Sequence, residues 1–127
     1  MAKYFIINLS PEDKTINFQT VSPEGEQLSE KKKLREIELI VMQNMFRYAR
    51  KMAKDFDLAM TISDCIDQVK NITDAETFIR FTKEDIGFLK DGFKVASGGP
   101  EINVWLDSCY DLMKQLKDPK PEEVSGE

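Results

Sequence analysis

The first residues of the chain alternate between apolar and polar positions in the way that short β-strands do. Residues 4–9 are rich in aromatic and β-branched side chains, and residues 15–21 alternate with their isoleucine and phenylalanine on one face. Residues 10–14 between them have the polar, proline-containing composition of a turn. The pattern therefore predicts an N-terminal β-hairpin over about residues 3–21, with one face packed against the rest of the protein.

A longer segment with helical periodicity follows the predicted hairpin. Ser29 is suited to cap the start of a helix, and from about residue 30 to residue 56 apolar side chains recur at spacings of three and four. They form two neighbouring stripes, one of Leu34, Ile37, Val41, Met45, Tyr48 and Met52, the other of Leu39, Met42, Phe46, Ala49, Ala53 and Phe56. Because this apolar face is wide, we expect the segment to be a central core helix.

Shorter helical patterns fill the remainder of the predicted domain, residues 61–117. Residues 73–76 have a capping-box pattern, which predicts a further turn or two of helix. Residues 82–85 begin the next helix, which residues 97–100 end with a Ser-Gly-Gly-Pro stop signal. A last amphipathic helix is predicted from Glu101 to about Lys117.

These elements together predict an α+β fold in which a hairpin packs on four to five helices around one long central helix. At 127 residues the chain has the length of one ordinary domain. We assign residues 1–117 to this single domain. Residues 118–127 are polar, acidic and proline-bearing, and we expect them to be a disordered tail.

The chain contains no histidine, which removes the usual general base near neutral pH and the usual imidazole metal ligand. The sequence also has no glycine-rich phosphate loop and no Cys-x-x-Cys pair. Its formal net charge of -5 and its pI of about 4.9 disfavour non-specific binding to nucleic acid or to an anionic membrane. We therefore expect no catalytic residue, no cofactor and no bound metal, and a protein that is not an enzyme.

Cys65 and Cys109 lie among apolar neighbours, far apart in the sequence. Without a histidine partner they are expected to be free thiols packed in the core, as in a reducing compartment. The apolar run at the start is too short for a signal peptide, and no stretch approaches the roughly 20 apolar residues of a membrane span. We expect a cytoplasmic protein.

Three pairs of acidic residues lie at positions that bring carboxylates together: Asp64 with Asp67, Asp107 with Asp111, and Glu84 with Asp85. Carboxylates held close together bind divalent metals or perform acid–base chemistry. A small carboxylate and divalent-metal enzyme is therefore a second alternative function. Each pair falls on the polar side of its helix, and acids in a first turn also favour the helix dipole, so we expect solvated faces.

Two groups of cations flank the predicted long helix. One is a stripe on its last turns, formed by Arg47, Arg50, Lys51 and Lys54, and the other lies at its start, formed by Lys31, Lys32, Lys33 and Arg35. Cations near a helix C-terminus stabilise it by themselves, and the functional interpretation is docking of an acidic partner surface or a phosphate backbone. Apart from Tyr48 the stripe lacks aromatic residues for base stacking, which makes nucleic acid the less favoured partner.

The layout of the whole chain resembles that of small phage-encoded accessory proteins. The features that carry the resemblance are the small acidic chain, the N-terminal hairpin, the methionine-rich helix and the Phe-Thr-Lys-Glu-Asp-Ile-Gly-Phe-Leu-Lys segment at residues 81–90. A last helix that ends in a charged, proline-containing tail adds to it. The resemblance implies a role in virion assembly or on host machinery, in the host cell cytoplasm. That group has no common catalytic motif, so no functional residue is carried over.

We therefore expect a non-catalytic protein–protein interaction or assembly factor that binds another protein or a second copy of itself, and no membrane. The candidate contact surfaces are the open edge of the hairpin at Asn17 and Gln19, and the basic stripe. An unpaired edge strand leaves backbone donors and acceptors free for another strand. The alternative is a regulator that contacts nucleic acid, or an enzyme acting on it, through the stripe of Arg47, Arg50, Lys51 and Lys54.

Overall fold

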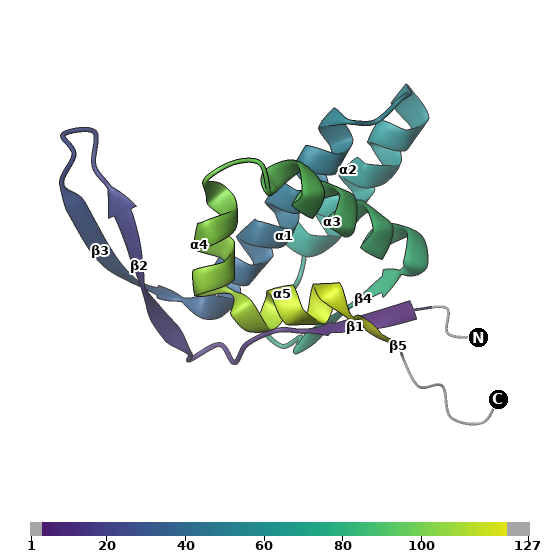
Figure 1. Cartoon of the computed structure of the whole chain (residues 1–127). Coiled ribbons are helices and arrows are strands. Elements are labelled where there is room, and N and C mark those ends of the chain that lie inside the picture. Colours follow the sequence, from purple (N-terminus) through teal and green to yellow (C-terminus); the bar gives the residue numbers. More distant parts are fainter. Residues whose placement is uncertain (1–3, 122–127) are drawn as a thin grey trace.

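The computed structural model describes residues 4–121, apart from the side chains of residues 18–21 and 101. In this part of the chain, five helices lie over a three-stranded antiparallel sheet, and a two-stranded hairpin projects to one side (Figure 1). The elements are β1 (Tyr4–Asn8), β2 (Thr15–Val21), β3 (Gln27–Lys33), α1 (Leu34–Lys51), α2 (Phe56–Lys70), β4 (Phe78–Thr82), α3 (Lys83–Ala96), α4 (Glu101–Ser108), α5 (Tyr110–Lys117) and β5 (Lys120–Pro121). The predicted α+β class with a long central helix is confirmed.

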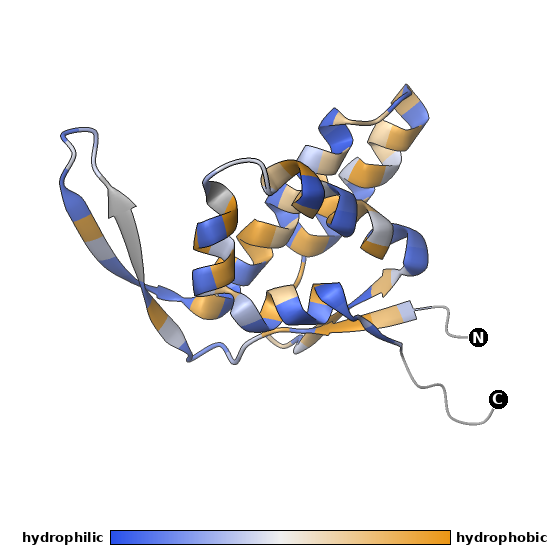
Figure 2. Ribbon diagram, viewed as in Figure 1, coloured by the Kyte–Doolittle hydropathy of each residue, from blue (hydrophilic) through white to orange (hydrophobic). Residues whose placement is uncertain are grey.

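The centre of the core is α1, which packs against α2 and α3 and carries nine buried residues. Phe46 is fully buried, and its ring centroid lies 5.8 Å from that of Phe81 on β4. Figure 2 shows apolar residues concentrated where the helices face one another and the sheet. Gly92 of α3 lies directly against the backbone carbonyl of Met45, so these two helices approach closely. None of the described helices has the length and apolar character needed to cross a membrane.

The N-terminal hairpin is present, but it is built from different strands than the sequence predicted. β2 pairs with β3, whereas β1 pairs with β4 and β5, so the predicted pairing within residues 3–21 was wrong. The β2–β3 turn is closed locally: the Ser22 N–H donates to the Glu26 carbonyl, the Glu26 N–H donates to Ser22 Oγ, and Gly25 supplies the positive φ. β3 is almost entirely polar, and a polar strand leaves no apolar alternation to detect.

The central helix is shorter than the predicted segment of residues 30–56. α1 begins at Leu34, because Ser29 and its neighbours belong to β3, and it ends at Lys51. Asp55 caps the next helix, since its side chain accepts a hydrogen bond from the Leu58 N–H at 2.8 Å and its backbone is extended. The chain must leave the helical conformation before Asp55, which ends α1 and starts α2 earlier than expected.

Residues 73–82 form a turn and a strand where the sequence predicted a turn or two of helix. The Glu76 carboxylate does accept hydrogen bonds from the backbone N–H and the hydroxyl of Thr73, as in a capping box. No helix follows, because β4 pairs with β1 and places Ile79 opposite Ile7, both buried. Burial of two apolar side chains, at about 1.5–3 kcal/mol each, outweighs a cap of about 1 kcal/mol.

The C-terminal part contains α3 as predicted and departs from the prediction in two places. The Thr82 and Asp85 capping box begins α3, and the stop at residues 97–100 ends it, as predicted. The last predicted helix is interrupted at Cys109 and forms α4 and α5. Lys120–Pro121 pairs with β1 as β5, so the expected disordered tail begins with a strand, and residues 122–127 lie outside the described part.

Candidate functional site

The β2–β3 hairpin, which we call the arm, extends away from the helices (Figure 1). Every residue of β3 is exposed, and α1 is the one helix with substantial contact to that strand. At the base of the arm, the Leu34 N–H donates to the Lys14 carbonyl at 2.9 Å. At about 3.4 Å per residue, strands of seven residues extend about 24 Å. A two-stranded hairpin without further packing is marginally stable in water, which makes the arm a surface suited to a partner.

The hydrogen-bond pattern of the arm shows which backbone groups face its free edge. Leu34 and Lys14 bond at the base, and Ser22 and Glu26 bond at the turn. Hydrogen-bonded and non-hydrogen-bonded pairs alternate along an antiparallel ladder. Because the pairs at the two ends are hydrogen-bonded, every second pair between them is too, and the Asn17↔Lys31 pair is one of the non-hydrogen-bonded pairs. The backbone N–H and C=O of Asn17 therefore point to the free edge of β2.

The two predicted edge residues have the same backbone orientation. Gln19, two positions after Asn17, belongs to the next non-hydrogen-bonded pair, Gln19↔Ser29. The Asn17 side chain is exposed, whereas the side chain of Gln19 lies outside the described residues. The structure therefore places the predicted contact edge on the outer side of β2.

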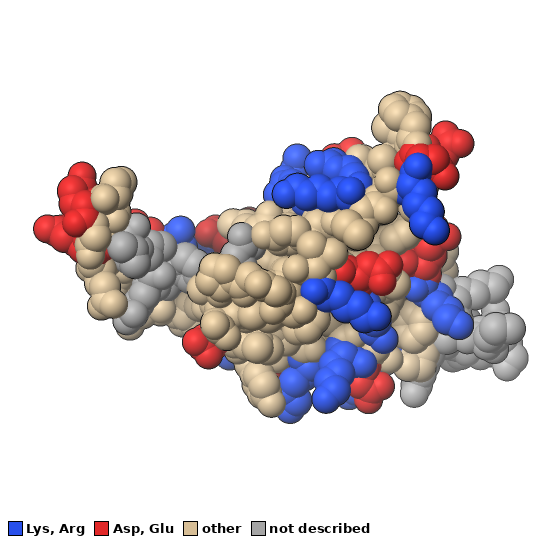
Figure 3. Space-filling model, turned by 45° about the horizontal axis from the view of Figure 1, so that its top comes forward, with Lys and Arg blue, Asp and Glu red and all other residues tan. Residues whose placement is uncertain are grey.

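The tip of the arm, residues 22–28, combines acidic side chains with an exposed leucine. Glu24 and Glu26 are exposed and pair with no described cation, and Leu28 is 43% exposed. Figure 3 shows acidic side chains at the end of the arm. Sequence reasoning missed this surface, because it ended the hairpin at about residue 21.

The structure brings together three of the four cations of the predicted basic stripe. A cavity of about 250 Å³ at the end of α1 is lined by Asn44, Arg47, Tyr48, Arg50 and Lys51. Lys54 is exposed in the connection to α2 and does not line this cavity. No described carboxylate forms an ion pair with any of the four cations. Their charge is therefore available to an acidic surface.

Each lining cation is held by a neighbouring side chain. Arg47 donates to Asn44 Oδ1 at 3.0 Å, and Arg50 donates to Ser63 Oγ at 3.1 Å. The Lys51 ammonium lies 5.2 Å from the centre of the Tyr48 ring, which is a cation–π contact. The helix dipole accounts for cations in the last turn of α1, but Arg47 precedes that turn.

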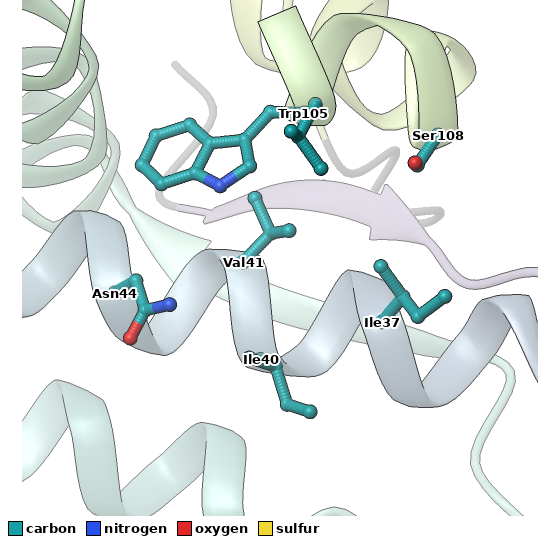
Figure 4. A pocket seen from close by; sticks show the side chains of 7 residues that line it. Ile37, Ile40, Val41, Asn44, Trp105 and Ser108 are labelled. Carbon is teal, nitrogen blue, oxygen red and sulfur yellow. The ribbon is translucent and has the colours of Figure 1, made fainter. Parts of the chain in front are cut away.

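A second cavity, of about 320 Å³, lies between α1 and α4 (Figure 4). It is lined by Ile37, Ile40, Val41, Asn44, Val104, Trp105 and Ser108. Trp105 is buried and its ring lies 6.2 Å from that of Tyr48, whereas Ile40 and Val104 are 55% and 42% exposed. The two cavities share Asn44, and we call them together the α1 groove, which has an apolar end and a basic end. Sequence reasoning missed its apolar end, because that end forms only where residues of α1 and α4, far apart in the sequence, pack together.

The basic cluster predicted at the start of the long helix is divided by the structure. Lys31, Lys32 and Lys33 are exposed on β3, but Arg35 is buried. Its guanidinium donates to the backbone carbonyls of residues 73 and 76. Arg35 therefore holds the turn before β4 against α1 and offers no charge to a partner.

Glu38 is a buried carboxylate that the sequence pattern did not indicate. It is 2% exposed, and it accepts hydrogen bonds from the Ser10 N–H at 2.8 Å and from the Ser10 hydroxyl at 3.0 Å. Burial raises the pKa of Glu38 above its ordinary value, while the bonds from Ser10 and the charge of Lys14 oppose this rise and Asp111 adds to it. Its site lies under the loop that joins β1 to β2.

The raised pKa predicts a pH-dependent contribution of Glu38 to stability. Because the folded protein holds this proton more tightly than the unfolded chain, Glu38 stabilises the fold most below its ordinary pKa of 4.5. That contribution is lost as the pH rises through the raised pKa. A Glu38→Gln variant keeps an acceptor for the Ser10 N–H and stays neutral, so it is expected to gain stability relative to the unchanged protein as the pH rises. Urea unfolding of both proteins between about pH 4 and pH 8 measures this difference. A difference that does not vary with pH contradicts the prediction.

The cysteines lie in the core, as the sequence predicted, but the pair Asp107 and Asp111 is divided, because Asp107 belongs to α4 and Asp111 to α5. Both cysteines are free and buried. Burial and a hydrogen bond from the thiol to Asp85 Oδ1 raise the pKa of Cys65, and burial with the nearby charge of Glu38 raises the pKa of Cys109 to about 12. Five of the six paired acids are exposed, and the sixth is Asp85. Within residues 4–121 no three cysteine or acidic side chains come together in a group that would hold a metal ion.

Comparison with known proteins adds no family to this description. No family model, curated protein or solved structure matches the chain.

Proposed function

We propose that the protein is a non-catalytic interaction or assembly factor, and that its arm is the element that binds the partner. The observation that carries the proposal is the free edge of β2, where the backbone groups of Asn17 face away from β3. An extended segment of another protein, or of a second copy, adds to this edge as a third strand and satisfies those groups. Strand addition also stabilises a hairpin whose strand β3 is exposed along its whole length.

The reactive side chains support a binding role over a catalytic one. The two thiols are buried and protonated at neutral pH, since the pKa of each is raised. Five of the six paired acids of the alternative metal enzyme are exposed, and the sixth, Asp85, caps α3 and accepts a hydrogen bond from the Cys65 thiol. The resemblance to phage-encoded accessory proteins stays a prediction, as does the nucleic-acid-binding regulator.

A proline at position 17 tests the proposed edge. Asn17→Pro removes a backbone donor that faces the free edge and leaves the β2–β3 ladder bonds in place. We expect partner capture from the source cell to fall while the helical circular dichroism signal stays the same. Asn17→Ala is the matched control, because it removes the same side chain but keeps the N–H, and we expect it to bind normally.

Two results count against the edge. One is an unchanged pull-down for Asn17→Pro. The other is an equal loss in Asn17→Pro and Asn17→Ala, which would assign the binding to the Asn17 side chain instead of the backbone.

A further inference from the structure

The tip of the arm and the α1 groove have complementary surfaces. The tip presents Glu24 and Glu26 without a described cation partner, together with the exposed Leu28. The groove has the matching arrangement, with Arg50 and Lys51 at one end and an apolar lining at the other. Figure 3 shows a group of Lys and Arg side chains beside a broad uncharged area on the body, with the acidic arm end well apart from both.

An acidic and an apolar group lie side by side on the tip, and a basic and an apolar region lie side by side in the groove. Glu26 extends the ladder of β3 by one pair through its backbone bond with Ser22, and Leu28 follows two positions later, so their side chains project from the same face of the arm. The groove follows one side of α1 from Ile37 to Lys51, a length of roughly 21 Å. An acidic and an apolar side chain of one strand therefore match a basic and an apolar region of one groove.

The direction of the arm determines which groove its tip can reach. The arm leaves the body at the start of α1 and points away from α1 and α4 (Figure 1). The groove of the same copy is on the body from which the arm projects. The projecting strands, about 24 Å long, bring the tip to the surface of another molecule. The turn at the tip is ordered by three hydrogen bonds that involve Ser22, which limits the entropy lost on docking.

We propose that the tip of the arm binds the α1 groove of a second copy of this chain. Leu28 enters the apolar end, beside Val104 and Trp105, and the two glutamates face Arg50 and Lys51. The contact is head-to-tail, because each copy contributes one tip and one groove, so further copies add as a ring or an open chain. This contact goes beyond the proposed function, since it leaves the edge of β2 free for a partner strand.

Charge reversal on each surface tests the contact. We expect the unchanged protein to self-associate with concentration in light scattering and sedimentation. We expect Glu24→Lys with Glu26→Lys, and separately Arg50→Glu with Lys51→Glu, to weaken that association at least about tenfold. Mixing the two double variants is expected to restore association, because each altered tip then meets an altered groove of opposite charge. All four residues are exposed, so the fold tolerates these changes.

Trp105 provides a second measurement of the same contact. It is the single tryptophan of the chain and lines the groove, so its emission is expected to change as the protein concentration rises. The same concentration series with Ile40→Glu, an exposed position of the groove, is expected to give no change in emission.

Matched controls separate this contact from the edge of β2 and from net charge. Lys83→Glu with Lys90→Glu alters the net charge of the chain as much as the groove variant but lies outside the groove, and it is expected to associate normally. Asn17→Pro is also expected to keep this association. A chain that stays monomeric, a tip variant that associates normally, or a mixture that fails to associate overturns the proposal. If Asn17→Pro is the only variant that loses association, the copies contact one another through the edge of β2, and the tip contact is overturned.

Discussion

Replacing Gly92 with alanine is expected to lower the free energy of unfolding by about 2 kcal/mol or more. A Cβ at this position lies 1.9 Å from the Met45 carbonyl oxygen and 2.6 Å from the carbonyl carbon. Both atoms belong to the backbone of α1, so α1 and α3 must move apart to accept a methyl group. The higher helix propensity of alanine raises the free energy of unfolding by only about 1 kcal/mol, which does not offset this loss. Denaturant unfolding followed by circular dichroism measures the loss.

Gly87 on the same helix is the matched control for this substitution. No atom lies within 4 Å of a Cβ at Gly87, so Gly87→Ala meets open space. We expect it to be neutral or to stabilise the protein by up to about 1 kcal/mol through helix propensity alone. Equal stabilities for the two alanine variants would mean that α1 and α3 do not pack as closely as the structure shows.

The helices were the part of the fold that the sequence predicted well, because their signals are local. The stripes of α1 and the capping box of Thr82 with Asp85 each depend on residues within a turn or two of one another. The strands depended on pairing across the chain. β1 carries a clear strand pattern, but its partner is β4, more than 70 positions away, and no local pattern selects that partner.

The pattern of apolar positions could not predict the polar strand β3 or the contacts of the buried charged residues. β3 has one apolar residue, Leu28, so its strand structure follows from the turn at Gly25 and the pairing with β2. Arg35 and Glu38 are charged residues that a pattern assigns to solvent. Their burial depends on carbonyls and a serine that come from loops distant in the sequence.

The candidate surfaces were predicted in part for the same reason. The basic stripe could be predicted because Arg47, Arg50 and Lys51 follow helical spacing within α1. The apolar end of the groove could not, since it forms only when Trp105 and Val104 of α4 pack against Ile40 of α1. The free edge was predicted at the right residue, Asn17, although the strand beside it was not the one expected.

Replacing Arg35 with methionine is expected to destabilise the protein by about 3 kcal/mol. Two hydrogen bonds from the guanidinium to the carbonyls of residues 73 and 76 are lost, and a hydrogen bond to a charged group contributes about 1.5–3 kcal/mol. Methionine fills the volume of the arginine stem but leaves both carbonyls without a donor. Arg35→Lys keeps the charge and reaches one carbonyl at a time, so its loss of stability is expected to be intermediate.

The same substitution also affects the arm, because Arg35 lies two residues after the end of β3. Loosening the first turn of α1 weakens the base of the arm, so backbone amides of β3 are expected to exchange faster with solvent in Arg35→Met. Lys31→Ala, an exposed change in the cluster that the sequence grouped with Arg35, is expected to alter stability by less than about 0.5 kcal/mol. Comparable losses of stability for Lys31→Ala and Arg35→Met would mean that Arg35 belongs to the surface cluster and does not hold the 73–76 turn against α1.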